Sequence, residues 1–338
     1  MRATTLHGPR DIRVEDVPDP TLELPTDAIV KVRAGCVCGS DLWPYRDEAT
    51  EGWRTIGHEA VGEVVAVGDE VRQVRVGDFV VVPFCHSDGT CPHCRAGVHS
   101  ACTNLGMTVS GQAEYARVTQ ADGSLVAVPG GAPDPALLPS LLTLTDVMAT
   151  GWHAAVSAGL RPGSTVAVVG DGAVGLCGVL AASAMGAERV VALSRHEPRQ
   201  RLAREFGATD VVAERGKEAT AALRELTGGV GADAVLECVG TGDAVRTAFA
   251  IARPGSTVGF VGVPHGVELP VNRMFATNVG LAGGMAPVRR YLPDLLERVL
   301  AGTMEPGRVF DLTLPLEEAP EAYRAMDERR AVKVMLEP

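Results

Sequence analysis

The sequence predicts an α/β fold in which a doubly wound parallel sheet follows a β-rich region. After Gly163, short apolar runs alternate with helical stretches, which is the order that βαβ units require. Before about Thr150, apolar or alternating runs stand between glycine and proline turns, a pattern typical of β structure. At 338 residues, the chain also exceeds what one hydrophobic core usually holds. We therefore expect two domains.

The β-rich region is expected to occupy residues 1–150. Its clearest strand patterns are valine-rich runs between turn residues, namely Ala28–Val32, Val61–Val67 and Phe79–Val82. Near the C-terminus, we expect a helix at Tyr291–Leu300 and a strand around Val332–Leu336. These last elements can return to the first domain, so that residues 288–338 complete it.

Residues 151–287 are expected to form the parallel sheet. Its strands are predicted at Val166–Val169, Val190–Leu193, Asp210–Ala213, Ala234–Val239, Thr257–Val263 and Val279–Gly283. Helical segments separate them, one ending at Met185, one beginning at Glu197, and others at Glu218–Leu226 and Ala244–Ala252. This alternation predicts a six-stranded parallel sheet with helices on its faces.

The charge and composition exclude several classes of function. The formal net charge is −11, and no basic patch is present to overcome repulsion from phosphate backbones or anionic membranes. Residues 1–20 contain no apolar signal core, and no window approaches the roughly 18 apolar residues of a membrane-spanning helix. We expect a cytoplasmic protein that binds neither nucleic acid nor membranes. In that reducing compartment, the eight cysteines favour metal ligation over disulfides.

Three glycines with G-x-G-x-x-G spacing follow the first strand of the parallel sheet. Gly170 permits a tight turn, Gly172 lets a pyrophosphate approach the backbone, and Gly175 lets the next helix pack against the strand. The N–H groups at the helix start, where Ala173 and Val174 lie, are expected to face the phosphates. The alternative is a glycine-rich turn without a ligand, but the flanking strand and helix favour a Rossmann dinucleotide site.

The residues after the second strand of this sheet indicate which dinucleotide binds. NAD sites place a carboxylate here to accept hydrogen bonds from the adenosine ribose. This chain instead has Ser194 and Arg195, a hydroxyl and a guanidinium that can bind a 2′-phosphate through charge-assisted hydrogen bonds. Arg199, one helical turn further on, either assists or is a solvated arginine of the helix surface. The sequence therefore predicts NADP(H) rather than NAD(H).

Three potential metal ligands, Cys38, His58 and Asp146, lie far apart in the first 150 residues. A thiolate, an imidazole and a carboxylate that leave one exchangeable position would make a catalytic zinc site. Each residue alone has an ordinary structural explanation, as a buried cysteine, a hydrogen-bonded histidine or a helix N-cap. Their combination with a dinucleotide motif favours the metal.

Several segments carry a resemblance to a known family. C-G-S-D at 38–41, G-H-E-A-x-G-x-V at 57–64 and the glycine motif are similar in order and spacing to the zinc-dependent medium-chain dehydrogenase/reductase family, over essentially the whole chain. The resemblance implies a GroES-like catalytic domain built from both chain ends, a central Rossmann domain, and a homodimer or homotetramer. It also implies hydride transfer between NADP(H) and an alcohol or carbonyl substrate. Members with Cys, His and Asp as zinc ligands include the NADP-dependent bacterial secondary-alcohol dehydrogenases.

The resemblance also assigns roles to neighbouring residues. Ser40 matches a hydroxyl that carries the substrate proton outward, and Asp41 matches a carboxylate that hydrogen-bonds the zinc-bound histidine. Glu59 matches a carboxylate beside the metal that can approach it during ligand exchange. Trp43 departs from the family, because many relatives have a histidine there that continues the proton path, and an indole N–H donates but does not accept. Proton exit is therefore expected to use another route.

A second metal signature consists of residues spaced D-x2-C-x2-C-x7-C; they are Asp88, Cys91, Cys94 and Cys102. The family pattern has four cysteines here, in a closed tetrahedral structural zinc site. Because carboxylates also ligate zinc, we expect a structural site of three thiolates and one carboxylate. The alternatives are that Cys85 or His86 replaces Asp88, or that this lobe binds no metal.

Two other functions remain open from the sequence. A zinc-independent NADPH quinone or enoyl reductase of the same fold would explain the nucleotide site but not the three metal ligands together. A protein that binds NADPH and zinc without turnover is also consistent with the fold, since a fold alone does not establish chemistry. The sequence specifies neither the particular alcohol or carbonyl substrate nor the physiological direction of the reaction.

Overall fold

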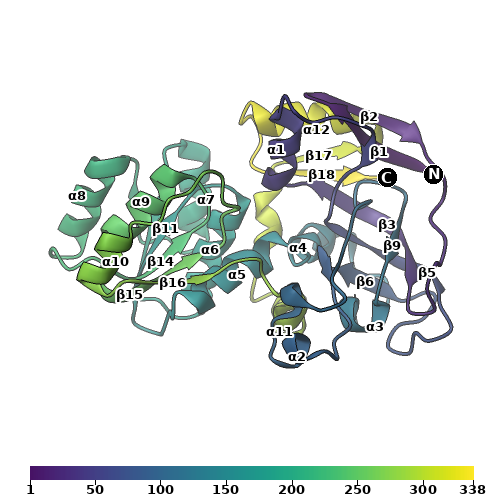
Figure 1. Cartoon of the computed structure of the whole chain (residues 1–338), viewed down its shortest axis with the longest axis horizontal. Coiled ribbons are helices and arrows are strands. Elements are labelled where there is room, and N and C mark those ends of the chain that lie inside the picture. The colour runs from purple at the N-terminus through teal and green to yellow at the C-terminus, as the bar shows by residue number, and fades with distance from the viewer. The chain divides into compact units, whose positions relative to one another are not determined.

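The computed structural model describes all 338 residues, which divide into two compact units. Residues 1–149 and 287–338 form the first, here called the β-rich unit, and residues 150–286 form the second, the parallel-sheet unit. In Figure 1, purple N-terminal strands and yellow C-terminal strands lie together in the β-rich unit. The predicted α/β fold is confirmed, since a parallel sheet with helices accompanies a predominantly β body.

A seven-stranded sheet forms the centre of the β-rich unit. Its strand order is β10-β6-β5-β3-β18-β17, and β9 also pairs with β3. The strands are β3 (Ala28–Val37), β5 (Ala60–Val67), β6 (Phe79–Val82), β9 (Tyr115–Val118), β10 (Val126–Ala127), β17 (Leu312–Pro315) and β18 (Val334–Glu337). The C-terminal strand β18 runs antiparallel to β3, with Met335 opposite Cys36 (Figure 1). This pairing fixes the C-terminal segment beside the strand that leads to Cys38.

Smaller elements complete the β-rich unit. Its minor sheets contain β1 (Arg2–Gly8), β2 (Asp11–Asp16) and β4 (Arg54–Thr55), and β7 (Cys85–His86) with β8 (Gly106–Met107). Its helices are α1 (Leu42–Arg46), α2 (Pro92–Arg95), α3 (Ala121–Ser124), α4 (Leu138–Thr143), α11 (Val288–Leu300) and α12 (Ala319–Asp327). The helix α12 packs against β2 and β18, and its Tyr323 is fully buried. Helix α5 (Val147–Ser157) begins in this unit and continues into the other.

The parallel-sheet unit contains six parallel strands in the order β13-β12-β11-β14-β15-β16. They are β11 (Thr165–Val169), β12 (Arg189–Leu193), β13 (Asp210–Val212), β14 (Ala232–Glu237), β15 (Ala252–Phe260) and β16 (Gly280–Gly283). The helices are α6 (Ala173–Ala184), α7 (Glu197–Glu205), α8 (Gly216–Leu226), α9 (Gly242–Ile251) and α10 (Val271–Thr277). From β11 to β13 successive strands are added on one side of β11, and from β14 to β16 they are added on its other side. This is the doubly wound arrangement of dinucleotide-binding folds. The predicted six-stranded sheet is confirmed.

Apolar side chains cover both faces of this sheet, which explains why the sequences of its central strands are nearly continuous hydrophobic runs. Val191 of β12, Val235 of β14 and Val258 of β15 are each fully buried, and Phe249 of α9 packs into the same cluster. Parallel sheets are normally covered on both faces, so nearly every strand position must be apolar. The helix α6 packs beside α7, and α8 packs beside α9.

The structure differs from the sequence-based expectations at several element boundaries. The strand expected at Ala28–Val32 continues to Val37, because β18 supplies hydrogen-bonding partners from the other end of the chain. The strand expected at Thr257–Val263 instead spans Ala252–Phe260, because the next two backbone N–H groups both donate to the Glu237 carbonyl and leave the regular ladder. No helix in the chain combines the length and hydropathy needed to cross a bilayer.

Candidate metal centres and dinucleotide site

Cys38, His58, Glu59 and Asp146 converge in the β-rich unit. Each offers one potential ligand atom, and these atoms all lie within 4.8 Å of one another. The Cys38 Sγ lies 3.7 Å from the Asp146 Oδ2, and the His58 Nε2 lies 3.2 Å from the same oxygen. Cys38 follows β3, His58 precedes β5, and Asp146 precedes α5, so three strand or helix ends bring the ligands together.

Asp41 orients both Cys38 and His58. Its Oδ1 lies 3.3 Å from the His58 Nδ1, and its Oδ2 accepts the backbone N–H of Cys38 at 2.9 Å. The Gln112 side-chain amide donates to the same Oδ2 at 3.2 Å, and the Tyr323 hydroxyl donates to Gln112 at 3.2 Å. With Nδ1 directed at Asp41, the Nε2 of His58 remains available to a metal. Gln112 and Tyr323 were missed by the sequence analysis, because no local pattern marks them.

The electrostatics of this cluster fit a divalent cation. Burial lowers the pKa of His58, but Asp41, Cys38 and Asp146 raise it well above its ordinary value. Burial raises the pKa of the Cys38 thiol, with a further contribution from Asp146. Without a metal, His58 and the Cys38 thiol therefore hold their protons more strongly than usual, and a bound cation would replace those protons. A thiolate and a carboxylate would together neutralise the charge of Zn²⁺, and the mixed S, N and O donor set suits that ion.

Glu59 is the fourth member of the cluster, and it is paired with a buried cation. The Lys333 Nζ lies 2.7 Å from the Glu59 Oε1, and the two side chains are 1% and 0% exposed. The Thr145 hydroxyl donates to the other carboxylate oxygen at 3.4 Å. Burial lowers the pKa of Lys333, but Cys36 and Glu59 raise it well above its ordinary value, so the lysine stays charged. Because Lys333 lies on the segment leading into β18, the C-terminus contributes directly to this site.

Ser40 and Trp43 lie on the short helical turns that follow Cys38. Ser40 belongs to the turn Gly39–Asp41 and is partly exposed, so its hydroxyl is accessible to proton exchange. Trp43 is in α1 and is 36% exposed. Both residues therefore occupy the region next to the metal-ligand cluster that the resemblance implies, although only Ser40 can both accept and donate a proton.

Asp88, Cys91, Cys94 and Cys102 form a second cluster, and their potential ligand atoms also lie within 4.8 Å of one another. The Cys91 Sγ is 3.5 Å from that of Cys94 and 3.9 Å from that of Cys102. Asp88 accepts the backbone N–H of Cys91 at 2.9 Å, and the Asn104 amide donates to it at 2.9 Å. The backbone N–H of Cys94 lowers the pKa of the Cys91 thiol to about 6, whereas burial raises the pKa of the Cys94 thiol to about 12, so a metal would bind one ready thiolate and displace a proton from another thiol. The donor set therefore fits zinc.

Cys85 and His86, the alternative ligands considered for this second cluster, are not part of it. The ring nitrogens of His86 are held by the hydroxyls of Thr119 and Thr108, at 3.0 and 2.8 Å. Burial lowers the pKa of His86 to about 4, so it is a neutral core residue. Cys85 is buried, and burial raises its pKa to about 12. Of the candidates, Asp88 is the one that joins the three cysteines.

The glycine motif has the geometry that a pyrophosphate needs. Gly170 adopts φ +117°, a conformation that disfavours side chains. A Cβ at Gly175 would lie 2.0 Å from the Gly170 carbonyl oxygen, so this glycine allows α6 to start directly against the turn. At Gly172 a Cβ would meet nothing within 4 Å, and the open space lies at the N-terminus of α6, where Ala173 and Val174 begin the helix. A dinucleotide phosphate fits this space and the helix N–H groups.

The residues predicted to bind the 2′-phosphate lie at the end of β12 and on α7. Ser194 is 2% exposed and its hydroxyl donates to Asp171, between the first two glycines, at 2.9 Å. Arg199 lies 3.3 Å from the other carboxylate oxygen of Asp171. Arg195 is exposed to solvent. Asp171 was not recognisable from the sequence, because its position in the motif accepts many residue types.

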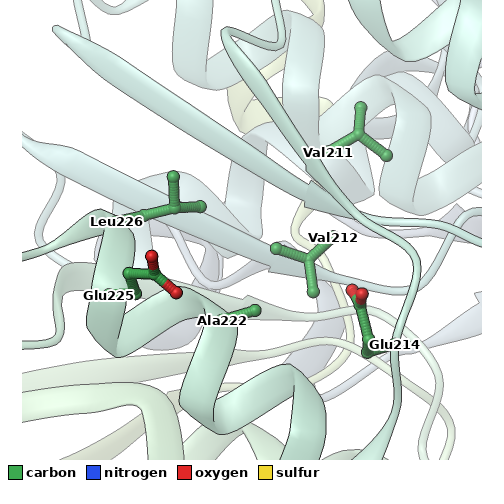
Figure 2. A pocket seen from close by; sticks show the side chains of 6 residues that line it. All are labelled: Val211, Val212, Glu214, Ala222, Glu225 and Leu226. Carbon is green, nitrogen blue, oxygen red and sulfur yellow. The ribbon is translucent and has the colours of Figure 1, made fainter.

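A surface depression in the parallel-sheet unit contains none of these candidate residues. Its lining comes from β13 and the loop after it and from α8, and Figure 2 shows the six side chains, Val211, Val212, Glu214, Ala222, Glu225 and Leu226. They offer two carboxylates and otherwise aliphatic carbon, without a histidine, cysteine or cation. The depression therefore supplies neither a metal-ligand set nor a cationic phosphate site.

Comparisons with known proteins agree with this fold and these clusters. A model of the alcohol dehydrogenase GroES-like domain matches residues 24–130, and a model of zinc-binding dehydrogenases matches residues 173–301. The chain is 38% identical to a probable zinc-binding alcohol dehydrogenase of Mycobacterium tuberculosis, over 96% of this chain and 84% of that protein. It is 34% identical to the NADP-dependent isopropanol dehydrogenase of Thermoanaerobacter brockii, over 84% of each chain.

A solved structure shows the same similarity. The alcohol dehydrogenase from Thermus sp. ATN1 superimposes with a TM-score of 0.91 at 32% identity, covering 100% of this chain and 99% of the other. A GroES-like unit with a Rossmann sheet and two clusters of metal-ligating side chains defines a class of zinc-binding dehydrogenases. The chain belongs to the zinc-dependent medium-chain dehydrogenase/reductase family and, within it, to the oxidoreductases of the zinc-type alcohol dehydrogenase group.

Proposed function

We propose that this protein transfers hydride between NADP(H) and an alcohol or carbonyl substrate at a zinc centre held by Cys38, His58 and Asp146. The observation that carries this proposal is the convergence of these side chains, which are separated by up to 108 residues in the chain. A zinc-independent reductase would not require a thiol, an imidazole and a carboxylate to meet. The likeness to the NADP-dependent isopropanol dehydrogenase supports an alcohol substrate.

The residues of this centre have separate roles in the proposed reaction. Zinc bound here would supply a Lewis acid that makes a substrate hydroxyl more acidic and polarises a carbonyl. Asp41 holds the His58 ring with Nε2 toward the cluster, and Lys333 holds Glu59 beside it. Ser40 accepts the proton of the alcohol in oxidation and returns it in reduction, because a hydroxyl both accepts and donates. Solvent completes the route, since Trp43 cannot accept a proton.

The preference for NADP(H) rests on cations at the end of β12. No carboxylate occupies the strand end itself, where Ser194 and Arg195 lie, and Arg199 follows on α7. A 2′-phosphate carries charge that a guanidinium binds through forked hydrogen bonds. The open space at Gly172 and the N-terminus of α6 would bind the pyrophosphate of the same molecule.

Replacing Arg195 by aspartate is expected to lower the ratio of kcat/KM for NADP to kcat/KM for NAD by about 10- to 100-fold, because one or more charge-assisted hydrogen bonds are lost. Steady-state kinetics with both oxidised cofactors measures this ratio. Arg204→Asp, at the opposite end of α7, provides a matched control and should leave the ratio unaltered. An unaltered ratio in Arg195→Asp would refute the role of Arg195.

Asp88, Cys91, Cys94 and Cys102 are proposed to hold a second, structural zinc. We expect two zinc ions per chain in the purified protein and about one in Asp88→Ala after dialysis against a weak chelator, because a three-ligand site loses much of its affinity. Elemental analysis by mass spectrometry provides the count. The control is Glu70→Ala, an exposed acid of the same unit, which should retain both ions. Two retained ions in Asp88→Ala would contradict ligation by Asp88.

We also propose a homodimer or homotetramer in the cytoplasm. β16 is the edge strand of the parallel sheet, and the neighbouring helix α10 exposes 87% of Phe275 and 63% of Val271. An unpaired strand edge beside exposed apolar side chains favours pairing with a second copy. The cysteines proposed as metal ligands have to stay reduced to bind zinc, which a reducing compartment favours.

A further inference from the structure

An acidic residue stands inside the glycine motif, between its first two glycines. The two carboxylate oxygens of Asp171 engage different donors: Oδ2 accepts the Ser194 hydroxyl at 2.9 Å, and Oδ1 lies 3.3 Å from the Arg199 Nη1. The same guanidinium nitrogen also donates to the Asp171 backbone carbonyl at 3.3 Å. The side chains of Asp171 and Arg199 are 19% and 14% exposed. These contacts form one partly buried network.

The donors in this network are groups that a 2′-phosphate would use. Ser194 and Arg199 are two of the three residues assigned to that phosphate, and both already bind one carboxylate. The amide of Gln200 holds the Ser194 carbonyl at 2.8 Å, which fixes the backbone position of the serine. An anion of the protein itself therefore occupies the hydrogen-bonding groups that would otherwise bind the anion of the cofactor.

We propose that Asp171 is a specificity-determining residue that lowers the preference of the protein for NADP(H) over NAD(H). The proposal rests on the dinucleotide site proposed above. Two effects act in the same direction. The carboxylate repels a 2′-phosphate and competes with it for Ser194 and Arg199, because like charges in a partly buried site are screened weakly. It can also accept a hydrogen bond from the 2′-hydroxyl of NAD(H), the role that a carboxylate at the strand end plays in NAD sites.

The position of this acid differs from that of the carboxylate in an ordinary NAD site. In an NAD site the carboxylate comes from the end of the second strand, where this chain has Ser194. Asp171 supplies a carboxylate from the glycine turn instead, within hydrogen-bonding distance of the Ser194 hydroxyl. The exposed Arg195 remains for the phosphate of NADP(H). The site therefore contains a group suited to each cofactor.

The test compares the binding of NADPH and NADH to the wild-type protein and to Asp171→Asn. This variant removes the charge but keeps a carbonyl oxygen that can accept the Ser194 hydroxyl. Fluorescence of the reduced nicotinamide gives both dissociation constants without turnover. We expect the ratio Kd(NADH)/Kd(NADPH) to rise at least about tenfold in the variant. A ratio that is unchanged or lower in Asp171→Asn would overturn the proposal.

Two further variants make the result specific. Asp210→Asn removes the same charge from the start of β13, at the opposite end of the strands, and should leave the ratio unaltered. Asp171→Ala removes the carboxylate altogether and should shift the ratio in the same direction as Asp171→Asn. It provides an independent measurement if one of the two variants folds poorly. An equal shift in Asp210→Asn would overturn the proposal, since any lost charge would then suffice.

The proposed preference for NADP(H) and the proposed role of Asp171 are tested by different quantities. The wild-type ratio alone reports whether the protein prefers NADP(H). The change of that ratio between wild type and Asp171→Asn reports on Asp171, whichever cofactor the wild type prefers. The dissociation constants of adenosine 2′,5′-bisphosphate and 5′-AMP give the same comparison for the adenosine end alone. A weaker preference for the bisphosphate in Asp171→Asn than in the wild type would count against the proposal.

Discussion

Cys38→Ala is expected to lower kcat/KM for alcohol oxidation by at least about a thousandfold and to remove one zinc ion per chain. The thiolate supplies one of the three proposed protein ligands and one of the two negative charges that neutralise the metal. Metal-ion catalysis contributes several kcal/mol of transition-state stabilisation, and each 1.4 kcal/mol corresponds to a factor of ten. Steady-state kinetics and elemental analysis of the same preparation measure the two losses together.

The chain offers a closely matched control for this experiment. Cys36 lies two residues earlier, near the end of β3, is fully buried, and is outside the ligand cluster. Cys36→Ala removes the same atom from a similar environment, so it should keep both zinc ions and most of the activity. If Cys38→Ala kept its zinc and normal turnover, the proposed centre would be wrong; equal losses in both variants would indicate a general packing defect.

The fold was largely predictable because its parallel-sheet unit is encoded locally. Its central strands β11, β12 and β14 are short runs rich in buried valine and alanine, and each is followed by a helix of the same unit, so pattern and order suffice. The Gly170–Gly175 turn was recognisable for the same reason, since strand, turn and helix are adjacent in the chain. The β-rich unit was harder, because β3 owes its last residues to β18 at the other end of the chain.

The same distinction between local and distant information applies to the site. Cys38, His58 and Asp146 belong to the residue types that bind zinc, so the sequence alone identified them as potential ligands. Gln112 and Lys333 were not predictable in this way, because amides and lysines are common surface residues. Their contacts join positions 71 and 274 residues apart in sequence, and only the folded chain shows them.

Lys333→Met is expected to destabilise the β-rich unit by about 3–5 kcal/mol, the usual effect of removing one partner of a buried ion pair. The variant leaves the Glu59 carboxylate fully buried, with neutral donors such as the Thr145 hydroxyl at 3.4 Å but no cation beside it. Calorimetric unfolding, compared with that of the wild-type protein, measures the loss. Lys31→Met, which removes an exposed lysine of β3, should change the free energy of unfolding by no more than about 0.5 kcal/mol.

A double variant identifies the cause of this loss. If the unpaired charge of Glu59 is responsible, Lys333→Met combined with Glu59→Gln should recover most of the stability, because no charge is then left without a partner. A double variant no more stable than Lys333→Met would show instead that the lysine acts through packing, for example against Phe310, whose ring centre lies 5.7 Å from its Nζ. The same variants separate stability from chemistry: Glu59 and Lys333 adjoin the metal ligands, so recovered stability without recovered turnover would assign the pair a role at the metal as well.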